Sequence, residues 1–172
     1  MGRKALLAIL GTAAALGLAL AAQVSAPAPQ AAQARIAPLA TRSVLLHATR
    51  AGRRIVAVGE FGHVLLSDDA GKSWRQARSV PTVTTLTAVS FVDAQTGWAV
   101  GHGGIVIGTQ DGGETWTVLT GTLEGQDALF SVLFSDAQNG FAVGPYGYAV
   151  RSADGGKTWK RIEIARGEDG ER

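Results

Sequence analysis

Short runs of apolar and β-branched residues alternate with glycine, asparagine and aspartate along most of the chain. In the middle of the sequence these runs cover residues 86–92, 98–100, 105–109 and 115–119. Each run is too short, and too closely bounded by turn residues, to form a helix, so each predicts a strand. Four strands within about 40–45 residues are the size of one β-propeller blade.

This pattern occurs three times. Residues 58–74, 100–116 and 143–159 align without gaps, and the tryptophans that end them recur at intervals of 42 and 43 residues. A repeat of this length predicts an all-β fold, a β-propeller-like array of about three four-stranded antiparallel blades. The blades are expected within residues 43–165, at about 43–81, 82–124 and 125–165.

The N-terminal region has a different composition. Arg3 and Lys4 precede an uncharged, apolar run over residues 5–22, which is typical of a secretory signal peptide. An uncleaved membrane anchor is the alternative, because about 18 apolar residues can just span a bilayer. Both alternatives predict a periplasmic or secreted protein, membrane-associated if the anchor remains. The expected organisation is a signal peptide over 1–26, a flexible tether over 27–42, the blades, and a charged tail over 166–172.

Composition excludes several functional classes. The 172 residues include no cysteine, which excludes disulfide scaffolds, thiolate zinc sites and cysteine nucleophiles. Without Arg3 and Lys4, the 16 basic residues fall to 14 and equal the 14 acidic ones. No basic surplus remains for binding nucleic acid, so no nucleic-acid partner is expected.

The turn between the third and fourth strands of each repeat carries the most specific motif. Residues 67–74, 109–116 and 152–159 resemble the Asp-box, the S-x-D-x-G-x-T-W hairpin of the bacterial neuraminidase repeat. Its aspartate is expected to accept backbone N–H bonds, its glycine to adopt a positive φ, and its tryptophan to bury a ring against the blade. The residues expected to have this structural role are Ser67, Asp69, Gly71, Trp74, Thr109, Asp111, Gly113, Trp116, Ser152, Asp154, Gly156 and Trp159.

The repeated aspartates do not predict a catalytic or metal site. The turns lack the distal glutamate of a calcium loop, and His47 and His63 are isolated, so neither a metal nor a cofactor is expected. A sialidase-like site needs a tyrosine paired with a carboxylate, whereas Tyr146 and Tyr148 both lie in one repeat and no carboxylate pair is distinguished. We therefore expect no enzyme. The alternatives are a fragment of a secreted sialidase-like glycoside hydrolase and a carbohydrate-binding module.

The fuller pattern G-[WF]-A-V-G-x-x-G, present at residues 97–104 and 140–147, precedes an Asp-box in both repeats. It resembles the photosystem II assembly and stability factor family, over about residues 43–165. The resemblance implies a non-catalytic, extracytoplasmic propeller that assists a membrane complex by binding a protein partner, an extramembrane segment of that complex. Family members have seven blades and about twice this length. Because propellers use about 4–8 blades, we expect a truncated copy or fragment, or self-association that completes the ring.

The loops between the second and third strands break the repeat at Glu60-Phe61, His102-Gly103 and Pro145-Tyr146. Repeat proteins often vary their binding residues in loops on one face, so Phe61, His102 and Tyr146 are candidate contact residues. Drift in solvated loops is the alternative. Basic residues on the outer strands are a second feature, which would pair with acidic partner segments or act as ordinary solvated charges: Arg50, Arg53, Arg54, Arg75, Arg78, Arg151, Lys160 and Arg161.

Overall fold

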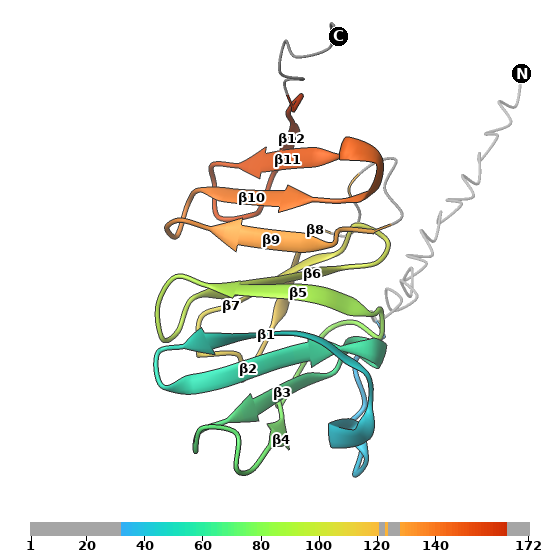
Figure 1. Cartoon of the computed structure of the whole chain (residues 1–172), viewed down its shortest axis with the longest axis vertical. Coiled ribbons are helices and arrows are strands. Elements are labelled where there is room, and N and C mark those ends of the chain that lie inside the picture. The colour runs from blue at the N-terminus through green and yellow to red at the C-terminus, as the bar shows by residue number, and fades with distance from the viewer. Residues whose placement is uncertain (1–31, 121–122, 124–127, 165–172) are drawn as a thin grey trace, which may run out of the picture. The chain divides into compact units, whose positions relative to one another are not determined.

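The computed structural model describes residues 32–120, 123 and 128–164 (Figure 1). The predicted signal peptide, 1–26, and the predicted charged tail, 166–172, lie outside these described residues. Within the described part of the chain, no helix is long and apolar enough to cross a membrane.

The described residues form three four-stranded antiparallel sheets, each with its strands in chain order (Figure 1). We call these sheets blades 1, 2 and 3. They confirm the predicted all-β array of three four-stranded blades. Blade 1 contains β1 (Leu45–Ala51), β2 (Arg54–Gly59), β3 (Val64–Ser67) and β4 (Arg75–Gln76). Blade 2 contains β5 (Leu86–Phe91), β6 (Gly97–Gly101), β7 (Val106–Thr109) and β8 (Thr117–Thr120). Blade 3 contains β9 (Ser131–Phe134), β10 (Gly140–Val143), β11 (Ala149–Ser152) and β12 (Lys160–Arg161).

Blade 2 is buried on both faces because it lies between the other two. Ala99 belongs to the core cluster shared with blade 1, whereas its neighbours Trp98 and Val100 belong to the cluster shared with blade 3. Successive strand residues point to opposite faces of a sheet, so a strand between two cores needs apolar residues at every position. This requirement explains why β6 is a continuous apolar run rather than an alternating one.

Blade 1 is covered on its outer face by a segment that precedes it. Leu65 and Ala57 point away from blade 2 and pack with Ala40, the first residue of the short 3-10 turn η1 (Ala40–Arg42). Backbone amides in this segment are also bonded, since Ala37 N donates to Gln76 Oε1 at 3.0 Å. Part of the region for which the sequence predicts a flexible tether is therefore packed against blade 1.

Blade 3 differs from blade 1 at its outer face. One side of blade 3 packs against blade 2 through Leu129, Val132 and Phe134. On the opposite side, Leu133 is 64% exposed and Phe141 is 37% exposed. The described array thus has one end covered by its own chain and one end that exposes large apolar side chains.

Candidate functional site

The Asp-box turn of blade 2 is held by its own side chains. Asp111 Oδ1 accepts hydrogen bonds from Thr109 Oγ1 and from the Thr115 amide, both at 2.9 Å, and Oδ2 accepts one from Thr115 Oγ1 at 2.6 Å. Trp116 Nε1 donates to the Gly113 carbonyl at 2.9 Å, and Gly113 has a φ of 85°. All of these bonds span four residues or fewer. Blades 1 and 3 repeat them around Asp69 and Asp154.

The electrostatics of these turns are those of structural carboxylates. Hydrogen bonds, that from the Ser73 hydroxyl first, lower the pKa of Asp69 to about 2, and those led by the Thr158 hydroxyl lower the pKa of Asp154 to about 2. Burial raises the pKa of Asp111, but the hydrogen bonds that it accepts outweigh burial, so its pKa is lowered overall. Carboxylates this acidic are poorly matched to proton transfer near neutral pH.

Catalytic and metal-binding chemistry finds little support elsewhere. No group of three or more histidines and carboxylates in the described residues is placed to hold a metal ion. Tyr148 is buried, with the guanidinium of Arg161 5.4 Å from its ring centroid, and Tyr146 is fully exposed. Neither environment resembles the shielded tyrosine–carboxylate pair that a sialidase-like mechanism needs.

The loops between the second and third strands hold two exposed aromatic rings in an unusual backbone conformation. Phe61, in the turn η2 (Glu60–Gly62), has a φ of 57°, and Tyr146, in η3 (Pro145–Gly147), has a φ of 55°. Their side chains are 62% and 102% exposed. Glycine occupies the equivalent position in blade 2, where Gly103 has a φ of 62°.

This geometry changes the place of His102 among the predicted contact residues. The left-handed position of blade 2 is Gly103, so His102 is equivalent to Glu60 and Pro145 rather than to the two aromatic residues. His102 is exposed, and its backbone amide donates to the Thr85 carbonyl at 3.0 Å. The sequence placed all three candidates in the correct loops but did not show which positions share a backbone conformation.

The ring of Phe61 lies beside a buried histidine, His63. The ring centroids of Phe61 and His63 are 6.0 Å apart, and His63 Nδ1 lies 2.9 Å from Ser43 Oγ. Burial lowers the pKa of His63, which favours the neutral imidazole near neutral pH. Its role is therefore positional rather than electrostatic.

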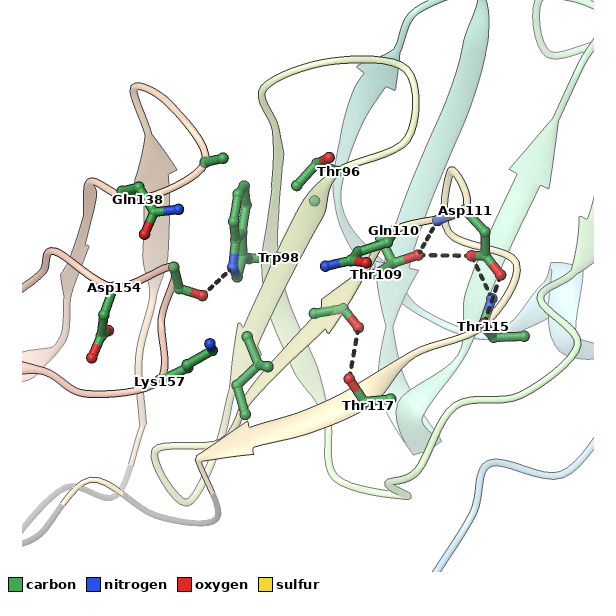
Figure 2. A pocket seen from close by; sticks show the side chains of 15 residues that line it. Thr96, Trp98, Thr109, Gln110, Asp111, Thr115, Thr117, Gln138, Asp154 and Lys157 are labelled. Carbon is green, nitrogen blue, oxygen red and sulfur yellow. Dashed lines mark hydrogen bonds between the residues drawn. The ribbon is translucent and has the colours of Figure 1, made fainter.

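A cleft of about 560 Å³ lies between blades 2 and 3 (Figure 2). Gln138 and Lys157 of blade 3 face Gln110 and Thr117 of blade 2 across it, and Trp98 lies between the two groups (Figure 2). Trp98 Nε1 donates to the Gly155 carbonyl at 2.8 Å. No sequence motif predicts this cleft, although its volume lies within the range of about 300–1,000 Å³ typical of ligand sites.

A cleft of about 580 Å³ also lies between blades 1 and 2, and Arg54 and Asp68, which line it, belong to a network of charged side chains. Glu114 accepts bonds from Arg75 and lies 3.0 Å from Arg54 Nη1, while Arg54 Nε is 2.6 Å from Asp68 Oδ1. Arg78 also approaches Glu114, at 3.7 Å. Three of the arginines proposed for partner binding are therefore engaged with carboxylates of the chain itself.

Residues 77–171 match the family described as photosynthesis system II assembly factor YCF48. The chain is 37% identical over 82 residues to the photosystem II stability/assembly factor HCF136 of Cyanidioschyzon merolae, covering 44% of this chain and 18% of that protein. It is 38% identical over 56 residues to the photosystem II assembly protein Ycf48 of Thermosynechococcus vestitus, covering 33% of this chain and 16% of that protein. These relatives are assembly factors rather than enzymes.

Solved structures with the same fold include YCF48 bound to a D1 peptide and YCF48 from Cyanidioschyzon merolae. The first gives a TM-score of 0.62 at 22% identity, over 69% of this chain and 40% of that chain. The second gives 0.56 at 20% identity, over 70% of this chain and 40% of that chain. The chain thus spans less than half the length of these relatives. Because the family match covers more than half of its residues, the chain belongs to the photosynthesis system II assembly factor YCF48 family.

Proposed function

We propose that the chain is a non-catalytic, extracytoplasmic propeller protein that assists the assembly or stability of a membrane complex by binding an extramembrane segment of one of its proteins. Membership of a family named for assembly factors supports the role. A YCF48 structure that holds a D1 peptide supports a protein segment as the partner. The signal peptide predicted over residues 1–26 supports the location.

We assign the contact to the loop face that carries Phe61 and Tyr146, with His102 in the corresponding loop of blade 2. The observation that carries this assignment is the exposure of two aromatic rings on left-handed backbone. A residue other than glycine in this region costs about 1–2 kcal/mol. Gly103 shows that the same turn forms without an aromatic side chain. Folding therefore does not require Phe61 or Tyr146, and strained, exposed residues of this kind are typical of functional sites.

The first experiment replaces Phe61 and Tyr146 by glycine, singly and together. Each change removes backbone strain, so stability in urea is expected to stay the same or to rise by up to about 1 kcal/mol. Affinity for the D1 peptide, measured by fluorescence anisotropy, is expected to fall about tenfold or more per residue, as for aromatic contact residues in other interfaces.

The matched control is Phe130→Thr, which removes an aromatic ring of similar exposure from a different surface of blade 3. This variant is expected to bind the peptide like the wild type. Unchanged peptide affinity in the double glycine variant would contradict the assignment. Photo-crosslinkers at positions 61 and 146 then identify the partner in cell extracts.

A carbohydrate is a second candidate ligand for the same face. Sugar-binding modules use exposed aromatic rings as platforms, and Phe61 and Tyr146 provide two such rings. A glycan array probed with the wild type and the double glycine variant separates the two candidates. Glycan binding that the variant loses, together with no peptide binding, would favour the carbohydrate.

Self-association that completes a ring stays a prediction. Ring closure would set the outer face of blade 3 against the outer face of blade 1 of a second copy. Because Ala37 and Ala40 cover that face of blade 1, closure requires their segment to move. Light scattering after size exclusion tests the mass of the chain in solution.

A further inference from the structure

Asn139 is followed by Gly140, and this pair of residues is chemically labile in flexible chains. Asn139 is also the only asparagine among the 172 residues. The backbone nitrogen after an asparagine can attack the side-chain amide carbon, and glycine hinders the attack least because it has no Cβ. The attack forms a cyclic imide and releases ammonia, and water then opens the imide to aspartate or isoaspartate. The sequence pair is therefore a candidate site of spontaneous deamidation.

Packing requires the glycine of this pair. A Cβ at Gly140 would overlap the ring of Phe134, and a Cβ at Gly97, the equivalent glycine of blade 2, would overlap the ring of Phe91. The residue before this glycine is not restricted in the same way, since it is Thr96 in blade 2 and asparagine in blade 3. The labile pair is thus a property of blade 3 and not of the repeat.

The folded turn between β9 and β10 holds both reacting groups. Asn139 Nδ2 donates to the two carboxylate oxygens of Asp136, at 3.1 and 3.0 Å, and Asn139 Oδ1 accepts a bond from Arg151 Nη2 at 3.4 Å. Gly140 is buried as the first residue of β10, where it is paired with Ser152 of β11. The Asn139 side chain must leave Asp136, and the end of the strand must open, before the Gly140 nitrogen can reach the amide carbon. Deamidation therefore depends on local opening of the turn.

Deamidation would turn an attractive contact into a repulsive one. Hydrogen bonds, that from the Gln138 amide first and that from the Asn139 side chain second, lower the pKa of Asp136, which is therefore ionised near neutral pH. A carboxylate at position 139 would face this charge and has no proton to donate to it. Arg151 would offset only part of the repulsion, because its bond is the longest of the three. The isoaspartate product would also lengthen the main chain by one methylene where β10 begins.

We propose that Asn139 is a deamidation site whose rate is set by opening of the β9–β10 turn, and that its conversion to aspartate or isoaspartate destabilises blade 3. The bond between Gly140 N and Asn139 Cγ forms, the bond from Cγ to the amide nitrogen breaks, and the Gly140 N–H proton leaves with the ammonia. Water then opens the imide and supplies the new carboxylate oxygen, so no other reactant is needed. This inference concerns the lifetime of the fold and does not depend on the proposed partner.

The test incubates the full chain near neutral pH and follows deamidation at position 139 by mass spectrometry of its proteolytic peptide. Replacement of the amide by a carboxylate raises the mass, and no other asparagine contributes. Because a hydrogen bond to a charged group must break first, we expect deamidation to be at least about tenfold slower in native buffer than in urea that unfolds the chain. Equal rates in the two solutions would overturn the dependence on turn opening.

A pair of variants separates opening of this turn from a general loss of stability. Asp136→Ala frees the Asn139 side chain and is expected to speed deamidation in native buffer about tenfold. The matched control is Asp93→Ala, because Asp93 Oδ1 accepts bonds from the Gln95 and Thr96 amides in the equivalent turn of blade 2, at 2.7 and 2.6 Å. This control loosens a similar turn without touching position 139, so its deamidation rate should equal that of the wild type. Equal acceleration in both variants would overturn the proposal.

The effect on stability is measured on aged protein. The chain deamidated at position 139 and the Asn139→Asp variant are both expected to unfold at a lower urea concentration than the fresh wild type. Asn139→Thr installs the residue that blade 2 has at this position, and its urea midpoint should stay constant during the same incubation. An unchanged midpoint in the fully deamidated chain would overturn the predicted destabilisation, and no deamidation in urea would overturn the site itself.

Discussion

The two interfaces between neighbouring blades use the same Asp-box carbonyl in different ways. Between blades 1 and 2, Gly112 O accepts a hydrogen bond from Arg54 Nη1 at 3.1 Å. Between blades 2 and 3, the equivalent Gly155 O accepts one from Trp98 Nε1 at 2.8 Å. The arginine belongs to a network of charges, whereas the indole ring stacks on Phe134, with ring centroids 3.6 Å apart and planes at 5°.

The difference shows which parts of the repeat are fixed and which can vary. The Asp-box holds the carbonyl in place, so donors of quite different shape can reach it from the neighbouring blade. Beside the buried apolar cluster that blades 1 and 2 share, their interface has a charged part with side chains such as Arg54 and Asp68, 21% and 54% exposed, whose attraction is weakened by water and salt. The aromatic interface is stabilised by the burial of ring surface, and salt and pH change this stabilisation very little. The two interfaces should therefore respond to different perturbations.

The largest effect is expected from Trp98→Ala. This change removes the stack on Phe134 and the bond to Gly155 O from a side chain that is 3% exposed. Truncating a large aromatic side chain in a core lowers the free energy of unfolding by about 3–5 kcal/mol. Urea denaturation of the variant tests this loss. Val56 occupies the same position in blade 1, and Val56→Ala is the matched control with a smaller expected loss. Equal losses in the two variants would contradict the distinction between the interfaces.

A smaller effect is expected when charge is exchanged at equivalent Asp-box positions. Glu114→Lys replaces the carboxylate held by Arg54 and Arg75 with a cation, which removes charge-assisted hydrogen bonds and adds repulsion. We expect a loss of about 2 kcal/mol in chemical denaturation. The reciprocal change, Lys157→Glu, lies in the cleft between blades 2 and 3, whose described lining residues include no arginine, and is expected to change stability by no more than about 0.5 kcal/mol. A large loss of stability in Lys157→Glu would show that residues of the cleft between blades 2 and 3 also stabilise the fold, which would contradict the distinction between the two interfaces.

The smallest effect is expected from acid. The hydrogen bond from Arg75, partly opposed by burial, lowers the pKa of Glu114. A carboxylate with a lowered pKa stabilises the fold above its unfolded pKa of about 4.3, and this stabilisation is lost as the pH falls through the folded value. Asp69 and Asp154 have pKa values of about 2, so the stabilisation that these two carboxylates give is lost as the pH falls toward 2.

The midpoint of urea unfolding should therefore be nearly constant from neutral pH to about pH 5 and then decrease as the pH approaches 2. Glu114→Gln should reduce the size of this decrease, because glutamine does not titrate. Trp98→Phe, which preserves a ring at the aromatic interface, should show the same pH dependence as the wild type. A wild-type midpoint that rises on acidification would contradict the assigned pKa shifts.

The Asp-box and the strands are the parts of the molecule that the sequence determines. The bonds of Asp111 reach only from Thr109 to Thr115, so the spacing of the motif is enough to define the turn. Strand positions follow for the same reason, since glycine and aspartate end each apolar run. The predicted runs 98–100 and 105–109 correspond to β6 and β7 within one or two residues.

Contacts between blades were decided by the tertiary structure. Trp98 and Gly155 are 57 residues apart, and nothing local to either residue shows that they meet. The tryptophans of the Asp-boxes also differ in burial. Trp116 packs into the core between blades 1 and 2, whereas Trp74 is half-buried beside the segment that contains Ala37 and Ala40.

Exposure was also decided only by the assembled fold. The apolar residue Leu133 follows the strand pattern as well as Val132 does, yet only Val132 is buried, since blade 2 covers one face of blade 3 and leaves the other exposed. In the same way, the gapless alignment of the repeats already pairs Gly103 with Phe61 and Tyr146, but only the backbone angles showed that all three positions adopt a positive φ. Local hydrogen bonds and turn preferences are encoded within a few residues, whereas burial depends on which surfaces meet, and these surfaces come from residues about 40 positions apart in the repeat.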